Sequence, residues 1–134
     1  MAQEAPMNAL QELGGTAEAA LERLNADPEF TLKARKWEGR FKVVRGNDTV
    51  VIQMHEGAVD RIEVDPTIFT AADFTIAASK EEWDRLLVRE PAPFYQDIYS
   101  AWLHHGFTVD GDLEQFFGFH MALRRLQQML RGIE

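Results

Sequence analysis

The chain has 134 residues, of which 22 are acidic and 14 basic, and its net charge is −8. This length is typical of one domain that buries a core without cross-links, and we predict a single domain over residues 1–134. The acidic balance argues against nucleic acid as a partner, and because the chain has no cysteine, disulfides and cysteine-based zinc sites or nucleophiles are excluded.

The first fifteen residues do not resemble a secretory signal, because they carry two glutamates, no basic residue and no continuous apolar core. The sequence leaves open whether residues 1–15 are disordered or loosely helical. No stretch approaches the roughly 18 apolar residues that a membrane span needs. We therefore predict a cytoplasmic protein that makes at most transient contact with membranes.

The N-terminal third combines two short helices with a set of strands. Thr16 is a candidate N-cap for a helix over residues 16–24, and Asp27 followed by Pro28 is a favoured start for another. The apolar period then changes from helical to two, which predicts strands that keep one apolar face. These strands form an antiparallel meander, and its other face is open to water or lightly covered. The strands span residues 37–43, 49–55 and 60–64.

A fourth strand, residues 74–78, runs directly into a helix. Ser79 is the predicted N-cap, and Glu82 stands three residues later, in the reciprocal arrangement called a capping box. The helix then repeats large apolar residues at spacings of three and four, starting at Trp83. We interpret Trp83 as a core anchor that holds this helix on the sheet.

The C-terminal third is rich in aromatic residues. A helix is predicted from Pro93 to Gly106, then a strand over residues 107–109, and then a long helix capped by Asp112. This last helix has two apolar stripes, so it needs a second apolar surface, which could come from the aromatic helix, a partner subunit or a ligand. The first stripe contains Phe116, Phe119, Leu123, Leu126 and Leu130, and the second contains Leu113, Phe117 and Met121.

Two short stretches, in this order, resemble a known family. They are F-T-I-x-x-S-x-x-x-W-x-x-L-L over residues 74–87 and G-F-T-V-x-G-D over residues 106–112, the latter followed by an amphipathic helix. Together with Trp37, Phe41 and Gly57 in the meander, they are similar to lipid-transfer domains of the sterol carrier protein type. The similarity covers roughly residues 20–131.

The resemblance implies an α+β fold, in which a five-stranded, mainly antiparallel sheet and helices over one face enclose an apolar tunnel. It also implies binding of sterols, fatty acids, acyl-CoA or phospholipids without cofactor or chemistry. The chain is richer in aromatics between Leu87 and Gly106 than is usual for the family, which leaves open a tunnel filled by its own side chains. Each candidate lining residue could equally belong to the core; they are Ile52, Met54, Ile76, Tyr99, Trp102, Leu103, Phe116, Phe117, His120 and Met121.

Histidines and carboxylates offer weaker signals for chemistry. Adjacent His104 and His105 point about 100° apart on a helix, which argues against a metal site shared with His120. His55 beside Glu56 could serve as an acid and base pair, but its place next to a turn favours a solvated rim. Asp112 is accounted for by capping.

Three functional classes follow, in order of preference. The first is a non-catalytic carrier that binds and transfers a hydrophobic ligand such as a fatty acid, acyl-CoA or sterol. The second is an accessory or dimerisation module for a partner enzyme, whose surface would cover the same apolar stripes. The third is a small enzyme on hydrophobic substrates, which requires His55 or an aspartate to point into the pocket with a shifted pKa.

Overall fold

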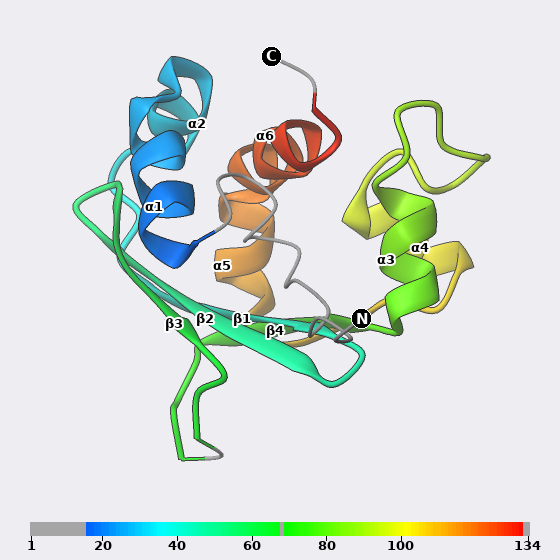
Figure 1. Cartoon of the computed structure of the whole chain (residues 1–134), viewed down its shortest axis with the longest axis horizontal. Helices are drawn as coiled ribbons and strands as arrows, with labels where there is room; N and C mark the ends of the chain where they lie inside the picture. The colour runs from blue at the N-terminus through cyan, green and yellow to red at the C-terminus, as the bar shows by residue number, and fades with distance from the viewer. Residues whose placement is uncertain (1–15, 68, 133–134) are drawn as a thin grey trace, which may run out of the picture.

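The computed structural model describes residues 16–67 and 69–132, so the interpretation of residues 1–15 lies outside the described part. Five strands form one mixed sheet in the order β3-β2-β1-β4-β5, in which only the β1–β4 pair is parallel. Figure 1 shows the helices gathered over one face of this sheet, as predicted. In chain order the elements are α1 (Ala17–Ala26), α2 (Pro28–Lys33), β1 (Gly39–Arg45), β2 (Asp48–His55), β3 (Ala58–Val64), β4 (Phe74–Ala78), α3 (Lys80–Leu86), α4 (Ile98–His104), β5 (Thr108–Gly111), α5 (Leu113–Gly118) and α6 (His120–Leu130).

The predicted meander is confirmed by the pairing of β1, β2 and β3. Phe41 lies opposite Ile52, which in turn lies opposite Ile62, so one face of the three strands is apolar. The turn between β2 and β3 requires Gly57, whose φ is +79° and whose absent Cβ would lie 2.8 Å from the Arg35 Cα. This turn is thereby packed directly against the backbone that follows α2.

Residues 65–67 and 69–73, called the crossover from here on, belong to the connection from β3 to β4 and lie on the face opposite the helices (Figure 1). Val51 points to that outer face, yet only 4% of it is exposed, because the crossover lies over it. The outer face is thus lightly covered, as the one-sided strand pattern indicated.

The corner at Ser79 forms as predicted, but only half of the capping box is present. The Ser79 hydroxyl accepts a hydrogen bond from the Glu82 amide at 3.1 Å. The Glu82 carboxylate accepts hydrogen bonds from the Tyr95 hydroxyl at 2.5 Å and the Gly106 amide at 2.7 Å. Glu82 therefore ties α3 to both ends of the segment that contains α4, a role that its sequence spacing did not indicate.

Two helix boundaries differ from prediction. The aromatic helix spans only Ile98–His104, because Phe94 has a left-handed φ of +68° and Asp97 caps the helix by accepting from the Ser100 amide at 2.8 Å. The last helix is divided at Phe119 into α5 and α6. The Asp112 cap at the start of α5 is confirmed by a 3.1 Å hydrogen bond from the Gln115 amide.

The core on one half of the sheet is built from aromatic rings. Trp37 stacks on Phe119 with ring centroids 4.6 Å apart and on Phe41 at 5.0 Å. The indole N–H of Trp37 also donates to the side chain of Gln115 at 2.9 Å. We call this region the aromatic half; it consists of Trp37, Phe41, Phe74, Phe116 and Phe119.

Candidate functional site

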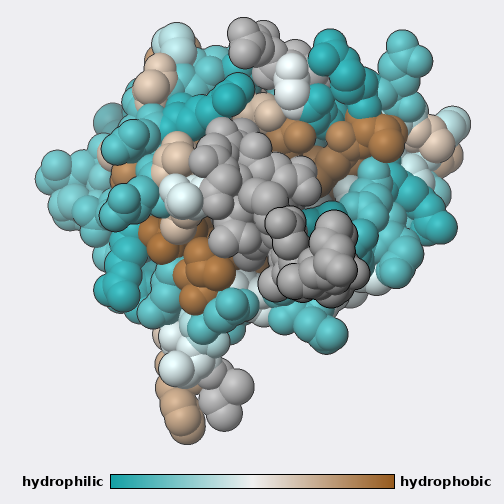
Figure 2. Space-filling view, in the orientation of Figure 1, coloured by the Kyte–Doolittle hydropathy of each residue, from teal (hydrophilic) through white to brown (hydrophobic). Residues whose placement is uncertain are grey.

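An apolar cleft lies between the sheet, α3 and α6. Trp83 is buried at one side of it and donates its indole N–H to the Val44 carbonyl at 2.8 Å, which fixes α3 on β1. Figure 2 shows hydrophobic side chains at the surface between α6 and the segment that joins α3 to α4. The lining consists of Phe41, Val43, Ile76, Trp83, Ile98, Leu123, Leu126, Gln127 and Leu130.

The cleft is nearly closed, because its free volume is about 20 Å³. A cavity needs roughly 10–15 Å³ by this measure to hold one water molecule, whereas pockets for small molecules usually measure roughly 300–1,000 Å³. An open tunnel therefore stays a prediction, and a lipid could enter only if α6 moved away from α3.

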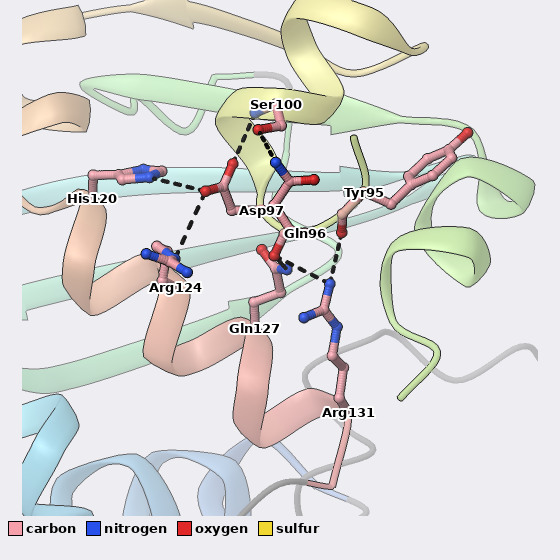
Figure 3. Close-up of polar contacts among 8 residues, drawn as sticks. All are labelled: Tyr95, Gln96, Asp97, Ser100, His120, Arg124, Gln127 and Arg131. Atoms are coloured by element: carbon pink, nitrogen blue, oxygen red, sulfur yellow. Dashed lines mark hydrogen bonds and ion pairs between the residues drawn. The ribbon is translucent and has the colours of Figure 1, made fainter. Parts of the chain in front are cut away.

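Figure 3 shows a row of polar side chains along α6 that contact the start of α4 and the residues before it. We call it the polar row; its members are His120, Arg124, Gln127 and Arg131, spaced by three or four so that they share one side of the helix. Gln127 donates to the Gln96 carbonyl at 2.9 Å, and it is buried among the apolar residues of the cleft.

Arg131, directly after α6, makes the most contacts in this row. Its Nη2 donates to the Tyr95 carbonyl at 2.7 Å, and its Nε donates to the Leu86 carbonyl at 2.8 Å. One guanidinium therefore joins the ends of α6 and α3 to the segment before α4. Hydrogen bonds to a charged donor are stronger than neutral ones, so these contacts favour the closed cleft.

Asp97 connects the start of α4 to the other end of the polar row. Its carboxylate lies 3.7 Å from Arg124 Nε and 3.8 Å from His120 Nε2. Burial lowers the pKa of His120 below its usual value, an effect that outweighs the opposing attraction of Asp97. The His120 Nδ1 is buried without a hydrogen-bond partner in the described part of the chain. His120 is therefore held in its neutral form near neutral pH.

The predicted lining residues fall into separate groups. Ile76 lines the cleft. Ile52 and Met54 are fully buried on the sheet, and Phe116 is fully buried within the aromatic half. His120 belongs to the polar row. The ligand-binding role of these residues stays a prediction, and the structure brings only Ile76 directly to the cleft.

The other predicted lining residues lie on an exposed surface, which we call the aromatic patch. Tyr99 packs edge-on against Phe117 at 5.4 Å, and Trp102 lies 6.4 Å from the same ring. Phe117 and Met121 are each 48% exposed, so the second apolar stripe of the last helix is only partly covered by α4. The patch consists of Tyr99, Trp102, Leu103, Leu113, Phe117 and Met121.

Sequence reasoning missed most of the cleft. Leu126 and Leu130 were assigned to packing, because a stripe that faces a sheet and a stripe that lines a cleft have the same period. Val43 and Ile98 carried no separate signal. The one clue in the sequence was Gln127, a polar residue at helical spacing from Leu123 and Leu130, which indicates that this apolar face meets a polar group.

The histidines that could have served in chemistry lie outside the cleft. His55 is exposed, and the Glu38 carboxylate, 3.1 Å away, raises the pKa of its imidazole. His104 and His105 stack on Phe94 and Tyr95. Within residues 16–67 and 69–132, no group of three histidine, aspartate or glutamate side chains has the arrangement of a metal site.

Comparisons with known proteins support the fold. No protein-family model matches the sequence, and a comparison with curated protein sequences found no match. A crystal structure of sterol carrier protein 2 matches with a TM-score of 0.68 and 20% identity over 94% of this chain and 95% of the other. Sterol carrier protein domain 2 of Helicoverpa armigera matches with a TM-score of 0.55 and 19% identity over 92% of this chain and 91% of the other.

The same fold is found within a larger enzyme. The sec-alkylsulfatase Pisa1 of Pseudomonas matches with a TM-score of 0.53 and 20% identity, over 81% of this chain but only 16% of the sulfatase. The chain therefore has the sterol carrier protein 2 fold, as the sequence motifs indicated. In the described part, no helix is long and apolar enough to cross a bilayer.

Proposed function

We propose that this protein binds and transfers a hydrophobic ligand, such as a fatty acid, acyl-CoA or sterol, without catalysing a reaction. The supporting observation is the apolar cleft between the sheet, α3 and α6, which is bordered by hydrogen bonds of the polar row. The two sterol carrier structures with the same fold add support. Transfer in the cytoplasm is part of the proposal.

Ligand entry requires separation of α6 from α3 and from the segment before α4. This movement breaks the bonds that Gln127 and Arg131 donate to three backbone carbonyls. Water replaces these partners, so the net cost is about 1 kcal/mol for each bond. Burial of about 400 Å² of an acyl chain, at roughly 25 cal/mol per Å², gives a gross gain of about 10 kcal/mol. The gain exceeds the cost of breaking these bonds, and the rest of it offsets the association cost of several kcal/mol.

Titration with a fluorescent fatty acid tests the proposal. The Leu130→Trp variant places a large ring at the partly exposed edge of the cleft, and we expect it to weaken binding at least about tenfold. The Leu130→Ala variant removes side-chain volume from the cleft and should bind as tightly as the wild type or more tightly.

Leu32→Trp is the matched control, because Leu32 is exposed on α2 and belongs neither to the cleft nor to the aromatic patch. Circular dichroism and thermal melts establish that each variant is folded. If a folded Leu130→Trp variant binds the fatty acid as well as the Leu32→Trp control does, the cleft is not the binding site.

The aromatic patch favours a second candidate, an accessory module that contacts a partner protein. Exposed clusters of large apolar side chains often mark interaction surfaces, and this one includes Tyr99, Leu103 and Phe117. The likeness to a part of the sec-alkylsulfatase shows that this fold can be combined with an enzyme in one chain.

Sedimentation velocity over a range of concentrations tests the simplest case of this candidate, self-association. A dimer that dissociates in the Phe117→Ser variant would support it. A wild-type monomer at every concentration would exclude a homodimer and leave only a different partner protein for this candidate.

A further inference from the structure

The outer face of the sheet carries a polar hollow that the proposed lipid site does not use. It measures about 280 Å³ and lies between β1, β2 and β3 on one side and the crossover on the other. Its floor is Val51, and its rim includes Phe69 and Thr70 of the crossover. We call it the outer hollow.

Two arginines border the outer hollow, one on each side of the same β2 residue. Arg40 on β1 pairs with Gln53 on β2, and Gln53 pairs with Arg61 on β3, so the three residues form one row across the strands. Because adjacent strands lie about 4.8 Å apart, the two arginine backbones are roughly 10 Å apart. Long arginine side chains can converge from that separation on one anion.

The charges around the outer hollow leave Arg40 available. Glu63 lies 3.6 Å from Arg61 and also accepts a hydrogen bond from the Thr70 hydroxyl at 3.3 Å. In the described part of the chain no carboxylate forms an ion pair with the Arg40 guanidinium. Lys42 follows on the same face of β1. The outer hollow itself is lined by two cations, Arg40 and Arg61, and one carboxylate, Glu63. The Glu38 and Asp73 carboxylates line an adjoining hollow that shares Arg40.

The strand and the crossover are joined next to the outer hollow. Asp73, the last residue of the crossover, accepts a hydrogen bond from the Arg40 amide at 2.9 Å and donates its own amide to the Arg40 carbonyl at 2.8 Å. The Asp73 carboxylate also accepts from Gln115 at 3.3 Å. The backbone of Arg40 is therefore held in place, while its guanidinium is exposed. Phe69, 88% exposed, stands at the rim and offers an apolar contact.

We propose that the outer hollow binds an anionic group, a phosphate or a carboxylate, held between Arg40 and Arg61. Guanidinium groups suit these planar or tetrahedral anions because their N–H donors match the spacing of the oxygens. The group could belong to a small free anion or to a lipid headgroup. The site lies on the opposite face from the apolar cleft and does not depend on the lipid-carrier proposal.

The experiment compares the wild type with the Arg40→Gln/Arg61→Gln double variant. One arm titrates inorganic phosphate and follows backbone amide shifts of residues 40, 53 and 61 by NMR. The other arm measures sedimentation with phosphatidylcholine vesicles that contain phosphatidic acid. The control is Arg85→Gln/Arg89→Gln, which removes the same charge from exposed residues on and after α3, on the helix side.

We expect the wild type and the control to bind in at least one arm and the double variant to bind at least about tenfold more weakly. Binding of phosphate identifies a free anion as the source, and binding of vesicles alone identifies a headgroup. Absence of binding by the wild type in both arms would overturn the proposal. Equal loss in the control and the double variant would also overturn it, because net charge alone would then explain the effect.

Discussion

The two halves of the helix-covered face of the sheet are packed by different side chains. In the aromatic half, Trp37 stacks between Phe41 and Phe119, and the rings fill the space between β1, α5 and α6. In the other half, the aliphatic chains of Ile76, Leu126 and Leu130 face each other across the apolar cleft. Both halves are largely buried, so the difference is in what keeps them closed.

Rigid stacked rings interlock, whereas aliphatic side chains can separate and accept an apolar guest without losing polar partners. Gln127 and Arg131 donate hydrogen bonds to backbone carbonyls at the border of the apolar cleft. Water can replace these partners when the cleft opens. The comparison therefore predicts that stability resides in the aromatic half and ligand uptake in the cleft. The following predictions test that division, from the largest expected effect to the smallest.

The largest loss of stability is expected for Trp37→Ala. It removes ring contacts with Phe41 and Phe119 and the hydrogen bond to Gln115, and it leaves a large cavity. The free energy of unfolding should fall by about 3–5 kcal/mol in urea denaturation. A loss below about 1 kcal/mol would show that the aromatic half is not the stabilising region.

Arg131→Met should lower stability less and raise ligand uptake. The variant keeps an unbranched apolar stem but removes the guanidinium and its hydrogen bonds to the Leu86 and Tyr95 carbonyls. We expect a loss of about 1.5–3 kcal/mol in unfolding free energy and faster uptake of a fluorescent fatty acid in stopped flow. Lys80→Met on α3 is the control, because Lys80 is exposed and, among the residues that the structure describes, forms an ion pair only with Asp84. Slower uptake by Arg131→Met would contradict a closing role for the polar row.

His120 should make the fold less stable in mild acid. Because burial lowers its pKa in the folded protein, the unfolded chain takes up the proton first as the pH falls below about 6.5. The unfolding free energy should therefore decrease from pH 7 to pH 5 more steeply in the wild type than in His120→Gln. Exposed His55, whose pKa is raised, acts in the opposite direction but is present in both proteins. Parallel pH profiles would show that His120 is not responsible.

Phe117→Ala should have the smallest effect on stability, under about 1 kcal/mol, because nearly half of this side chain is exposed. This variant distinguishes between two candidate ligand sites, the cleft and the aromatic patch. If the cleft is the site, fatty acid affinity should be unchanged, and if the aromatic patch takes part, as the sequence prediction has it, affinity should fall. Fluorescence titration distinguishes the two outcomes.

The fold was largely predictable because its signals are local. Alternating apolar residues defined the meander, and the side chains of Thr16, Asp27, Ser79 and Asp112 cap helices at the predicted positions. The start of α4 was missed because Pro93 and Gly106 suggested a complete helix, whereas Asp97 caps it later and Phe94 turns the chain.

The candidate site was less predictable because it depends on contacts between distant segments. The pairs Gln127–Gln96 and Arg131–Leu86 are 31 and 45 residues apart, and no periodicity reveals them. Leu126 and Ile76 meet across the cleft only because β4 inserts beside β1 in parallel. A pattern of apolar positions identifies which residues are buried but not which of them can separate.

NMR contacts between a bound fatty acid and protein methyl groups test the central claim most directly. With methyl-labelled protein and palmitate, we predict nuclear Overhauser effects from the acyl chain to Ile76, Leu126 and Leu130, which line the cleft, and none to Ile52, which is buried outside it. Contacts to Ile52 without contacts to Leu126 and Leu130, or binding without contacts to any of these methyl groups, would contradict a ligand site in the apolar cleft.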